Sequence, residues 1–197
     1  KRYGWRNLME ALNTIPGFYK YYDQIYTYVG VRGFGRPGDY NSRILLMING
    51  MRVNENLYDS AGFGYNFPLD MDLIDRIEII YGPGGSLYGT SAVLAVVNVI
   101  TRTGKSVDGA EVSASAGSYN ALNGRFSYGG HTDKGLDILV SGSLFERDGR
   151  TFYFPDAGYI TSPDSDKASA ENLYVSMAYK ELAAQVGHNV SIQHVPA

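Results

Sequence analysis

The pattern of hydrophobic and polar positions changes near residue 104. Before that position, short apolar runs are separated by segments dense in Gly, Pro, Asn, Asp and Tyr. From Ala110 onward, apolar and polar residues alternate with a period of two, as in "ALNGRFSYGG" and "LDILVSGSLF". A period of two is typical of β-strands whose two faces meet different surroundings. The chain is therefore predicted to hold two domains, residues 1–104 and 105–197.

The first domain is predicted to be a small mixed α/β unit. Residues at helical spacing predict a helix that Pro16-Gly17 ends: Trp5, Leu8, Met9, Leu12 and Ile15. Strands are expected at 18–22, 25–33, 43–53, 74–82 and 96–102, with brief helical turns at 69–74 and 91–95. The strands are almost continuously apolar, which predicts that they are covered on both faces.

The second domain is predicted to consist of antiparallel strands with one apolar and one polar face. In one strand, Leu122, Phe126 and Tyr128 share a face, and small or polar residues occupy the positions between them. A transmembrane β-barrel needs this arrangement, because lipid lies outside its wall and polar groups lie inside. An antiparallel sheet of a soluble sandwich alternates as well, so alternation alone leaves both architectures open.

The lengths of the connections favour the barrel. Short turns are predicted at 117–120, 131–135 and 180–181, whereas about 27 residues after the third strand show no periodicity. Outer-membrane barrels have short turns on one side and longer loops on the other. The turns at 131–135 and 180–181 follow the second and fourth strands and the long connection follows the third, so they fall on opposite sides as a barrel requires. About five strands of roughly 9 to 11 residues fit, whereas the smallest closed barrels need about eight. We therefore expect the chain to be a fragment of a larger barrel.

Composition excludes several classes of function. The net charge of −3 and the pI near 5.6 give no basic surface for nucleic acid. The absence of cysteine excludes a disulfide framework and a thiolate site or nucleophile. The N-terminal residues form no signal-peptide core, and no apolar run approaches the roughly 18 residues of a membrane-spanning helix. The 17 tyrosines and 24 glycines are typical of β-rich proteins with aromatic side chains at an interface.

The stretch "IEIIYGPGGSLYG", residues 77–89, resembles a phosphate-binding loop only superficially. No lysine follows the glycines, and the helix after them has room for little more than one turn. The glycines are predicted to serve a tight structural turn formed by Gly82, Pro83, Gly84 and Gly89. No histidine or carboxylate cluster has metal-site spacing and no catalytic triad is evident, so we expect no enzyme activity, no metal and no cofactor.

Several motifs, in order, resemble the plug domain of TonB-dependent outer-membrane receptors. They are "LMEALNTIPGF", "VRGFGRPGDYNSRILLMINGMRVNE" and "FPLDMDLIDRIEIIYGPGGSLYGTSAVLAVVNVITRTG", within residues 5–104. The resemblance implies an α+β plug domain, with short helices on a small mixed sheet, inside a 22-stranded barrel. It also implies uptake of a scarce nutrient, such as a ferric siderophore or cobalamin, across the outer membrane of a Gram-negative bacterium. TonB would supply the driving force from the periplasm.

The resemblance also assigns candidate site residues. The loops 35–41 and 54–66 correspond to the family's ligand-facing apices, where Arg36, Tyr40, Tyr58 and Tyr65 are the expected contacts. Arginine can bind carboxylate or catecholate oxygens with two donors, and tyrosine both stacks and donates a hydrogen bond.

Three charged residues are expected to form contacts between plug and barrel: Arg43, Arg76 and Glu78. Arg76 and Glu78 alternate with isoleucines on one strand, so they could also form a simple salt bridge at the rim of the sheet.

Two features limit the resemblance. Tyr81 stands where the family commonly has arginine before Gly-Pro, which weakens an ion pair to the barrel at that position. The segment that binds TonB would precede Lys1, so the chain is not expected to couple to TonB unaided. Two other classes of function remain open, a secreted β-rich module that binds a ligand or glycan and a nucleotide-dependent enzyme.

Overall fold

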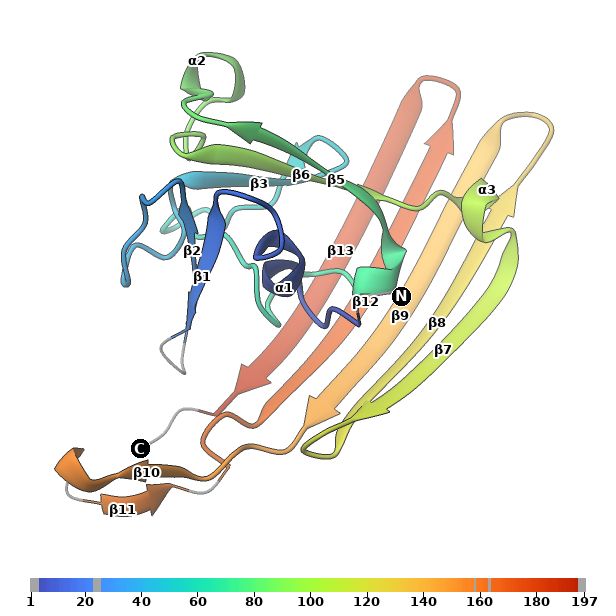
Figure 1. Cartoon of the computed structure of the whole chain (residues 1–197). Helices are drawn as coiled ribbons and strands as arrows, with labels where there is room; N and C mark the ends of the chain where they lie inside the picture. The colour runs from blue at the N-terminus through green and yellow to red at the C-terminus, as the bar shows by residue number, and fades with distance from the viewer. Residues whose placement is uncertain (1–3, 23–25, 158, 163, 195–197) are drawn as a thin grey trace. The chain divides into compact units, whose positions relative to one another are not determined.

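The computed structural model describes residues 4–22, 26–157, 159–162 and 164–194 (Figure 1). Two compact units are present in it. The first comprises residues 1–67 and 71–102, and the second comprises residues 68–70 and 103–197. The predicted order, a mixed α/β unit followed by antiparallel strands, is confirmed.

A mixed four-stranded sheet forms the centre of the first unit, in the order β4-β3-β6-β5. Its strands are β3 (Ile44–Ile48), β4 (Met51–Arg52), β5 (Ile74–Tyr81) and β6 (Ala95–Thr101). β3 and β6 run parallel, while β4 and β5 are antiparallel to their neighbours. All five residues of β3 are buried, as are most of β6, because both strands are runs of β-branched and aliphatic side chains.

The expectation that every strand is covered on both faces is wrong for β5. Its burial alternates, and Asp75, Arg76, Glu78 and Ile80 are exposed. β5 is an edge strand, paired only with β6 within the sheet, so charged side chains there remain in water. The expected single strand over 43–53 is divided into β3 and β4 by Asn49 and Gly50, which both have positive φ.

A hairpin and a short helix complete the core of this unit. β1 (Phe18–Tyr22) pairs antiparallel with β2 (Thr27–Val31). α1 (Leu8–Leu12) begins after Asn7, whose side chain accepts a hydrogen bond from the Glu10 amide. α1 is shorter than the apolar spacing from Trp5 to Ile15 predicts, but it buries Leu8, Met9, Ala11 and Leu12 as that spacing requires.

The helical turn expected before β5 is present as η1 (Met71–Leu73), whereas the prediction of a helix at 91–95 is wrong. The chain instead forms α2 (Gly85–Tyr88), inside the glycine-rich stretch, and residues 90–93 form a turn. Gly89 ends α2 with φ 78°, a conformation that favours glycine. None of the helices among the described residues is long and apolar enough to cross a membrane.

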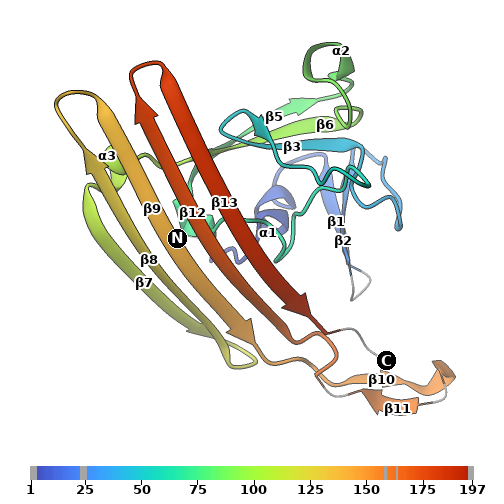
Figure 2. The same ribbon diagram turned by 180° about the vertical axis from the view of Figure 1, so that it is seen from behind.

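The second unit is built on a five-stranded antiparallel sheet in the order β13-β12-β9-β8-β7 (Figures 1 and 2). Its strands are β7 (Gly109–Gly117), β8 (Ala121–His131), β9 (Leu136–Arg147), β12 (Ala168–Tyr179) and β13 (Leu182–Gln193). The short helix α3 (Gly104–Val107) precedes β7, and a capping box between Thr103 and Ser106 stabilises its N-terminus. The predicted number of strands and the short turns between them are confirmed.

Burial in this sheet is inverted relative to a soluble protein. The large apolar side chains on one face are half exposed or more, as Leu122, Phe126 and Tyr128 show at 60%, 52% and 51%. On the opposite face Arg125, Ser127 and Ser141 are buried. A sheet that exposes its apolar side chains and buries its polar ones has the pattern of a barrel wall facing lipid. The two faces are those that the alternation predicts.

The long connection after β9 is more ordered than its sequence predicts. It contains a hairpin of β10 (Phe152–Phe154) and β11 (Tyr159–Ser162), with η2 (Pro155–Ala157) between them. β12 also begins at Ala168, earlier than the alternation beginning at Leu173 indicates, so the connection is shorter than expected. Residues 158 and 163 lie outside the described residues.

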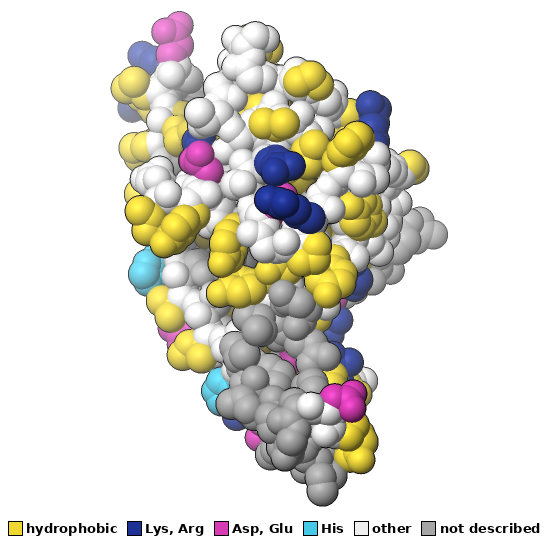
Figure 3. Space-filling model, turned by 90° about the vertical axis from the view of Figure 1, so that its left-hand side faces the viewer, with side chains coloured by type: hydrophobic (Ala, Val, Ile, Leu, Met, Phe, Trp, Pro, Cys, Tyr) yellow, Lys and Arg dark blue, Asp and Glu magenta, His cyan; other side chains and the backbone are white. Residues whose placement is uncertain are grey.

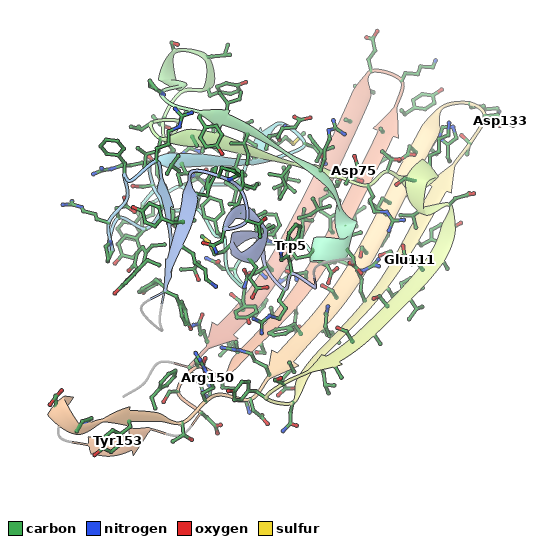
Figure 4. All side chains as sticks on the ribbon, viewed as in Figure 1. Trp5, Asp75, Glu111, Asp133, Arg150 and Tyr153 are labelled. Atoms are coloured by element: carbon green, nitrogen blue, oxygen red, sulfur yellow. The ribbon has the colours of Figure 1, made fainter. Side chains whose placement is uncertain are left out.

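The base of this hairpin is held by a buried carboxylate. Asp166 is fully buried and accepts hydrogen bonds from the Arg147 side chain at 2.8 Å and from the Arg150 backbone at 2.7 Å. Arg150 lies at the start of the connection, as Figure 4 shows. Desolvation acts to raise the pKa of Asp166, but the hydrogen bonds from Arg150 and the charges of both arginines outweigh it and lower that pKa.

Candidate ligand-binding site

A chain of tyrosine rings lies on the first unit, and it includes two of the predicted contacts. Tyr40 and Tyr58 have ring centroids 6.2 Å apart, and Tyr26 lies edge-on to Tyr40 at 5.6 Å. The Tyr28 ring lies 6.2 Å from that of Tyr26 and 6.0 Å from that of Tyr21. These separations are in the range in which aromatic rings attract one another. We call Tyr21, Tyr26, Tyr28, Tyr40 and Tyr58 the tyrosine cluster.

The tyrosine cluster is mostly accessible to solvent. Tyr58 is 67% exposed and Tyr26, Tyr40 and Tyr21 are nearly half exposed, whereas Tyr28 is buried. Tyrosine is coloured with the hydrophobic side chains in Figure 3, which shows such side chains beside Lys and Arg side chains on the face that it views. Exposed tyrosine rings can stack on a ligand and hydrogen-bond to it through their hydroxyls.

Glu55 shapes the loop that carries Tyr58. Its carboxylate accepts hydrogen bonds from the amides of Leu57 and Tyr58, the latter at 2.9 Å, and from the Ser60 hydroxyl at 3.4 Å. The amide hydrogen bonds from Tyr58 and Leu57 lower the pKa of Glu55. An ionised Glu55 therefore stabilises the backbone that presents the Tyr58 ring.

Asn41 joins the segments that carry the cluster. Its side-chain oxygen accepts a hydrogen bond from the Val29 amide at 2.8 Å, and its Nδ2 donates to the carbonyls of Thr27 and Ala61 at 2.9 and 3.0 Å. The side chain is buried, and the backbone has φ 60°. Asn tolerates this left-handed conformation better than most residues. One amide thus ties β2 to both tyrosine-bearing loops.

Asn54 and Arg52 connect the Tyr58 loop to the rest of the unit. Asn54 is buried, accepts a hydrogen bond from the Leu46 amide and donates to the carbonyls of Ile44 and Asp59. The Arg52 guanidinium binds the Asp59 carboxylate and the Ser91 hydroxyl. The sequence analysis did not identify Asn41, Arg52, Asn54 or Glu55. The signal that could have identified these residues is the position of polar side chains beside turn-forming sequences.

The other two predicted ligand contacts are Arg36 and Tyr65. Arg36 is exposed and forms no ion pair with another described residue. Tyr65 lies near Arg6, whose pKa is raised by its hydrogen bond to Glu10 and, to a smaller extent, by the charge interaction with Tyr65. The structure therefore brings two of the four predicted ligand contacts together, Tyr40 and Tyr58.

The three residues expected to contact the barrel have local partners. The Arg76 guanidinium binds Asp75 at 3.0 Å and Glu78 at 2.9 Å, and all three side chains are about half exposed. Arg43 lies 4.0 Å from Asp39. Exposed pairs of this kind contribute little to stability.

The glycine-rich stretch forms a turn, with Tyr81 as a support beside it. Gly82 and Gly89 have φ of 93° and 78°, and the Gly84 amide donates to the Ala92 carbonyl at 2.7 Å. The Tyr81 hydroxyl donates to the Pro16 carbonyl at 2.7 Å, and the Arg32 guanidinium lies 4.7 Å from the ring centroid. Tyr81 thus holds the end of β5 to the turn before β1. Pro83 is exposed at the centre of the bend.

The described residues contain no group of three or more His, Asp or Glu side chains that could hold a metal ion.

Residues 1–96 match the family described as "TonB-dependent Receptor Plug Domain". The chain is 31% identical over 148 residues to the vitamin B12 transporter BtuB of Vibrio vulnificus, covering 75% of this chain and 22% of that protein. It is 35% identical over 139 residues to BtuB of Photobacterium profundum, covering 66% of this chain and 20% of that protein. The chain therefore spans about a fifth of the length of these curated relatives.

Solved structures share the fold. The pyoverdine receptor FpvA of Pseudomonas aeruginosa, bound to pyoverdine, has a TM-score of 0.66 at 18% identity over 95% of this chain and 25% of its own. The ferric citrate transporter FecA in its unliganded form has a TM-score of 0.65 at 17% identity over 98% of this chain and 30% of its own. The secreted-module alternative finds no support in these similarities, and the relatives are transporters and receptors.

Proposed function

Because residues 1–96 belong to the plug-domain family of TonB-dependent receptors, we propose that the chain is the plug and the first barrel strands of an outer-membrane nutrient receptor. The observation that carries the proposal is the inverted burial of the five-stranded sheet. A sheet with exposed Leu122 and Phe126 and buried Ser127 and Ser141 is suited to a wall between lipid and a polar interior. A plug fold followed directly by such a wall is the arrangement that this family uses.

The receptor takes up a small molecule, cobalamin or a ferric siderophore. Support comes from relatives named as vitamin B12 transporters and from structural neighbours named as receptors for pyoverdine and ferric citrate. The tyrosine cluster is the ligand-binding surface of the plug, with Tyr40 and Tyr58 as its exposed contacts. Arg36 and Tyr65 extend the surface when the ligand carries oxygen atoms that an arginine or a phenol can reach.

TonB supplies the energy for transport. One charge moving across 100 mV is worth about 2.3 kcal/mol, so a few protons suffice to disturb a plug of ordinary stability. Transport then requires no bond in the substrate to be made or broken, and the chain uses no cofactor. Arg43, Arg76 and Glu78 exchange their exposed local partners for residues of the wall as the plug changes conformation. Residues 1–104 serve as the plug domain and residues 105–197 as wall.

Growth of a deletion strain tests this function. The full-length receptor is expressed in a strain that lacks it, and growth is measured with cobalamin or with single ferric chelates as the limiting nutrient. We expect one nutrient to restore growth at nanomolar supply, and the restoration to require TonB. A receptor that restores growth on none of the panel, or that does so without TonB, would contradict the proposal.

A further inference from the structure

A buried ion pair joins the segment Pro68–Asp70 to the polar face of β8. The Arg125 Nε lies 3.4 Å from the Asp70 Oδ1, and the two side chains are 1% and 9% exposed. Asn123, on the same face of β8, places its Nδ2 3.4 Å from the other oxygen of Asp70. Pro68–Asp70 therefore belongs to the second unit, although the residues on both sides of it belong to the first.

The guanidinium is oriented by the wall strands themselves. Arg125 donates to Glu111 of β7 at 3.1 Å and to the Ser127 hydroxyl, and Ser127 is in turn 2.8 Å from Ser141 of β9. Figure 4 labels Glu111 on its strand. Burying a guanidinium is unfavourable unless charged and polar groups surround it. Glu111 and the serines thus hold the Arg125 guanidinium at the position where it meets Asp70.

A second attachment lies where the chain enters the sheet. The Asp137 carboxylate of β9 accepts hydrogen bonds from the amides of Gly104 and Lys105 at 2.7 and 2.8 Å. Gly104 is packed so closely that a Cβ there would lie 2.1 Å from the Ile138 carbonyl oxygen. The start of α3 is thus held to β9 by hydrogen bonds and by close backbone packing.

These two attachments enclose one stretch of the plug. Residues 71–102, which form η1, β5, α2 and β6, begin directly after Asp70 and end directly before Thr103. Both ends of this stretch are consequently anchored to the same five-stranded sheet.

We propose that Asp70 and Arg125 form a latch that fastens the plug to the barrel wall and stays closed during transport. This inference rests on the proposed function, because it assumes that the plug moves when a ligand passes. Opening the latch would take from the buried Arg125 one of its two carboxylate partners, Asp70, and leave it with Glu111. Exposed pairs such as Arg76 and Glu78 separate at little cost, because both groups are already in water. Residues 71–102 then stay attached to the wall at both ends while the plug changes conformation.

Hydrogen–deuterium exchange tests whether the latch exists. The full-length receptor in detergent is compared with its Asp70→Asn variant and with Asp75→Asn, a matched control that removes an exposed carboxylate five positions away. We expect exchange of the amides at 69–73 to be at least tenfold faster in Asp70→Asn and within twofold of the unmodified protein in Asp75→Asn. Equal protection in the two variants would overturn the latch. This readout does not depend on transport, so it separates failure of the latch from failure of the proposed function.

Cross-linking tests whether the latch stays closed. Cysteines replace Asp70 and Arg125 in the full-length receptor, a short bis-maleimide joins them, and uptake of the nutrient that supports growth is compared before and after joining. We expect the joined receptor to keep at least half of its uptake rate. A loss of tenfold or more on joining, reversed with a cleavable linker, would show that the segment must leave the wall and would overturn the proposal.

Discussion

The rings of Tyr40 and Tyr58 lie 6.2 Å apart, centroid to centroid, although the residues belong to different loops of the plug. The two residues are not neighbours in sequence, since residues 41–57 between them include the strands β3 and β4. It results from Asn41 and from the hydrogen bond that the Ala61 amide donates to the Tyr40 carbonyl at 3.2 Å. The two loops therefore present one aromatic surface.

Removing the Tyr58 ring is expected to weaken ligand binding. Tyr58→Ala should raise the dissociation constant about tenfold, because an aromatic contact contributes roughly 0.5–1.5 kcal/mol beyond the area it buries. Equilibrium binding of the radiolabelled nutrient to the full-length receptor measures this. Tyr179→Ala, which removes an exposed ring from the wall strand β12, is the matched control and should leave the dissociation constant unchanged. Equal effects of the two variants would argue against the tyrosine cluster as the binding surface.

Asn41 is expected to stabilise the plug through its buried amide. Asn41→Asp should lower the free energy of unfolding by roughly 2–4 kcal/mol, because the carboxylate cannot donate to the carbonyls of Thr27 and Ala61. Denaturant unfolding of the full-length receptor, followed by plug fluorescence, measures the change. Asn41→Gly should destabilise similarly while relieving the positive φ, so Asn41→Ala should be the least stable of the three by about 1 kcal/mol. If Asn41→Gly is as stable as the unmodified protein, the backbone conformation alone explains the residue.

Glu55 predicts an acid-dependent weakening of ligand binding. Its pKa is lower in the folded protein than in the unfolded chain, so its contribution is present above the ordinary glutamate pKa and is lost as pH falls through the lowered value. Ligand affinity should be constant near neutrality and should fall in acid as the Tyr58 loop loosens. Measuring the dissociation constant against pH checks this. Glu55→Gln should remove most of this dependence, whereas Glu181→Gln, in the turn between β12 and β13, should retain it. An unchanged profile in Glu55→Gln would contradict the assignment.

Asp166 is expected to order the hairpin after β9. Asp166→Asn leaves Arg147 without its buried carboxylate, and breaking such a pair costs roughly 3–5 kcal/mol. Protease cleavage within residues 148–167 should become much faster in the intact receptor. Asp164→Asn is the control, since Asp164 is exposed and has φ 52°, which asparagine tolerates. If both variants are cleaved at the same rate, the carboxylate does not hold the hairpin.

The apolar face of the wall predicts a depth-dependent cost for charge. Leu173→Lys, in the middle of β12, should destabilise the receptor by about 2–4 kcal/mol in lipid, because lysine then faces the centre of the bilayer. Leu182→Lys, beside the turn at the start of β13, should cost only about 0–1 kcal/mol. Denaturant unfolding in lipid vesicles measures both. Similar costs at the two positions would be inconsistent with a membrane-facing sheet.

The wall strands could be predicted from sequence because alternation is a local property. Successive residues of a strand point to opposite faces, so an apolar Leu122 and a polar Ser127 each indicate the face on which they lie. The position of α2 could not be predicted in the same way. Gly84 and Gly89 bound a helix of four residues, which is too short to show a helical period.

The polar residues of the candidate sites depend on distant partners. Asn41 bonds to residues 12 to 20 positions away, and Asp70 meets Arg125 across 55 positions, a separation that no local pattern encodes. Asp70 directly precedes the helical turn η1, and an aspartate in that position is commonly a local helix cap, so its position gives no sign of a distant partner. Arg125 at a polar position of an alternating strand was the one available signal for the latch. A charged residue on the inner face of a wall strand requires a partner.

Energised uptake of the nutrient is the most direct test of the proposed function. Cells that express the full-length receptor are given the radiolabelled compound that supports growth, and accumulation is followed with and without a protonophore and with and without TonB. We expect accumulation against a concentration gradient that falls to the level of the deletion strain when either TonB or the proton gradient is removed. Accumulation that continues undiminished without both, or that never exceeds the deletion strain, would contradict an energised outer-membrane receptor.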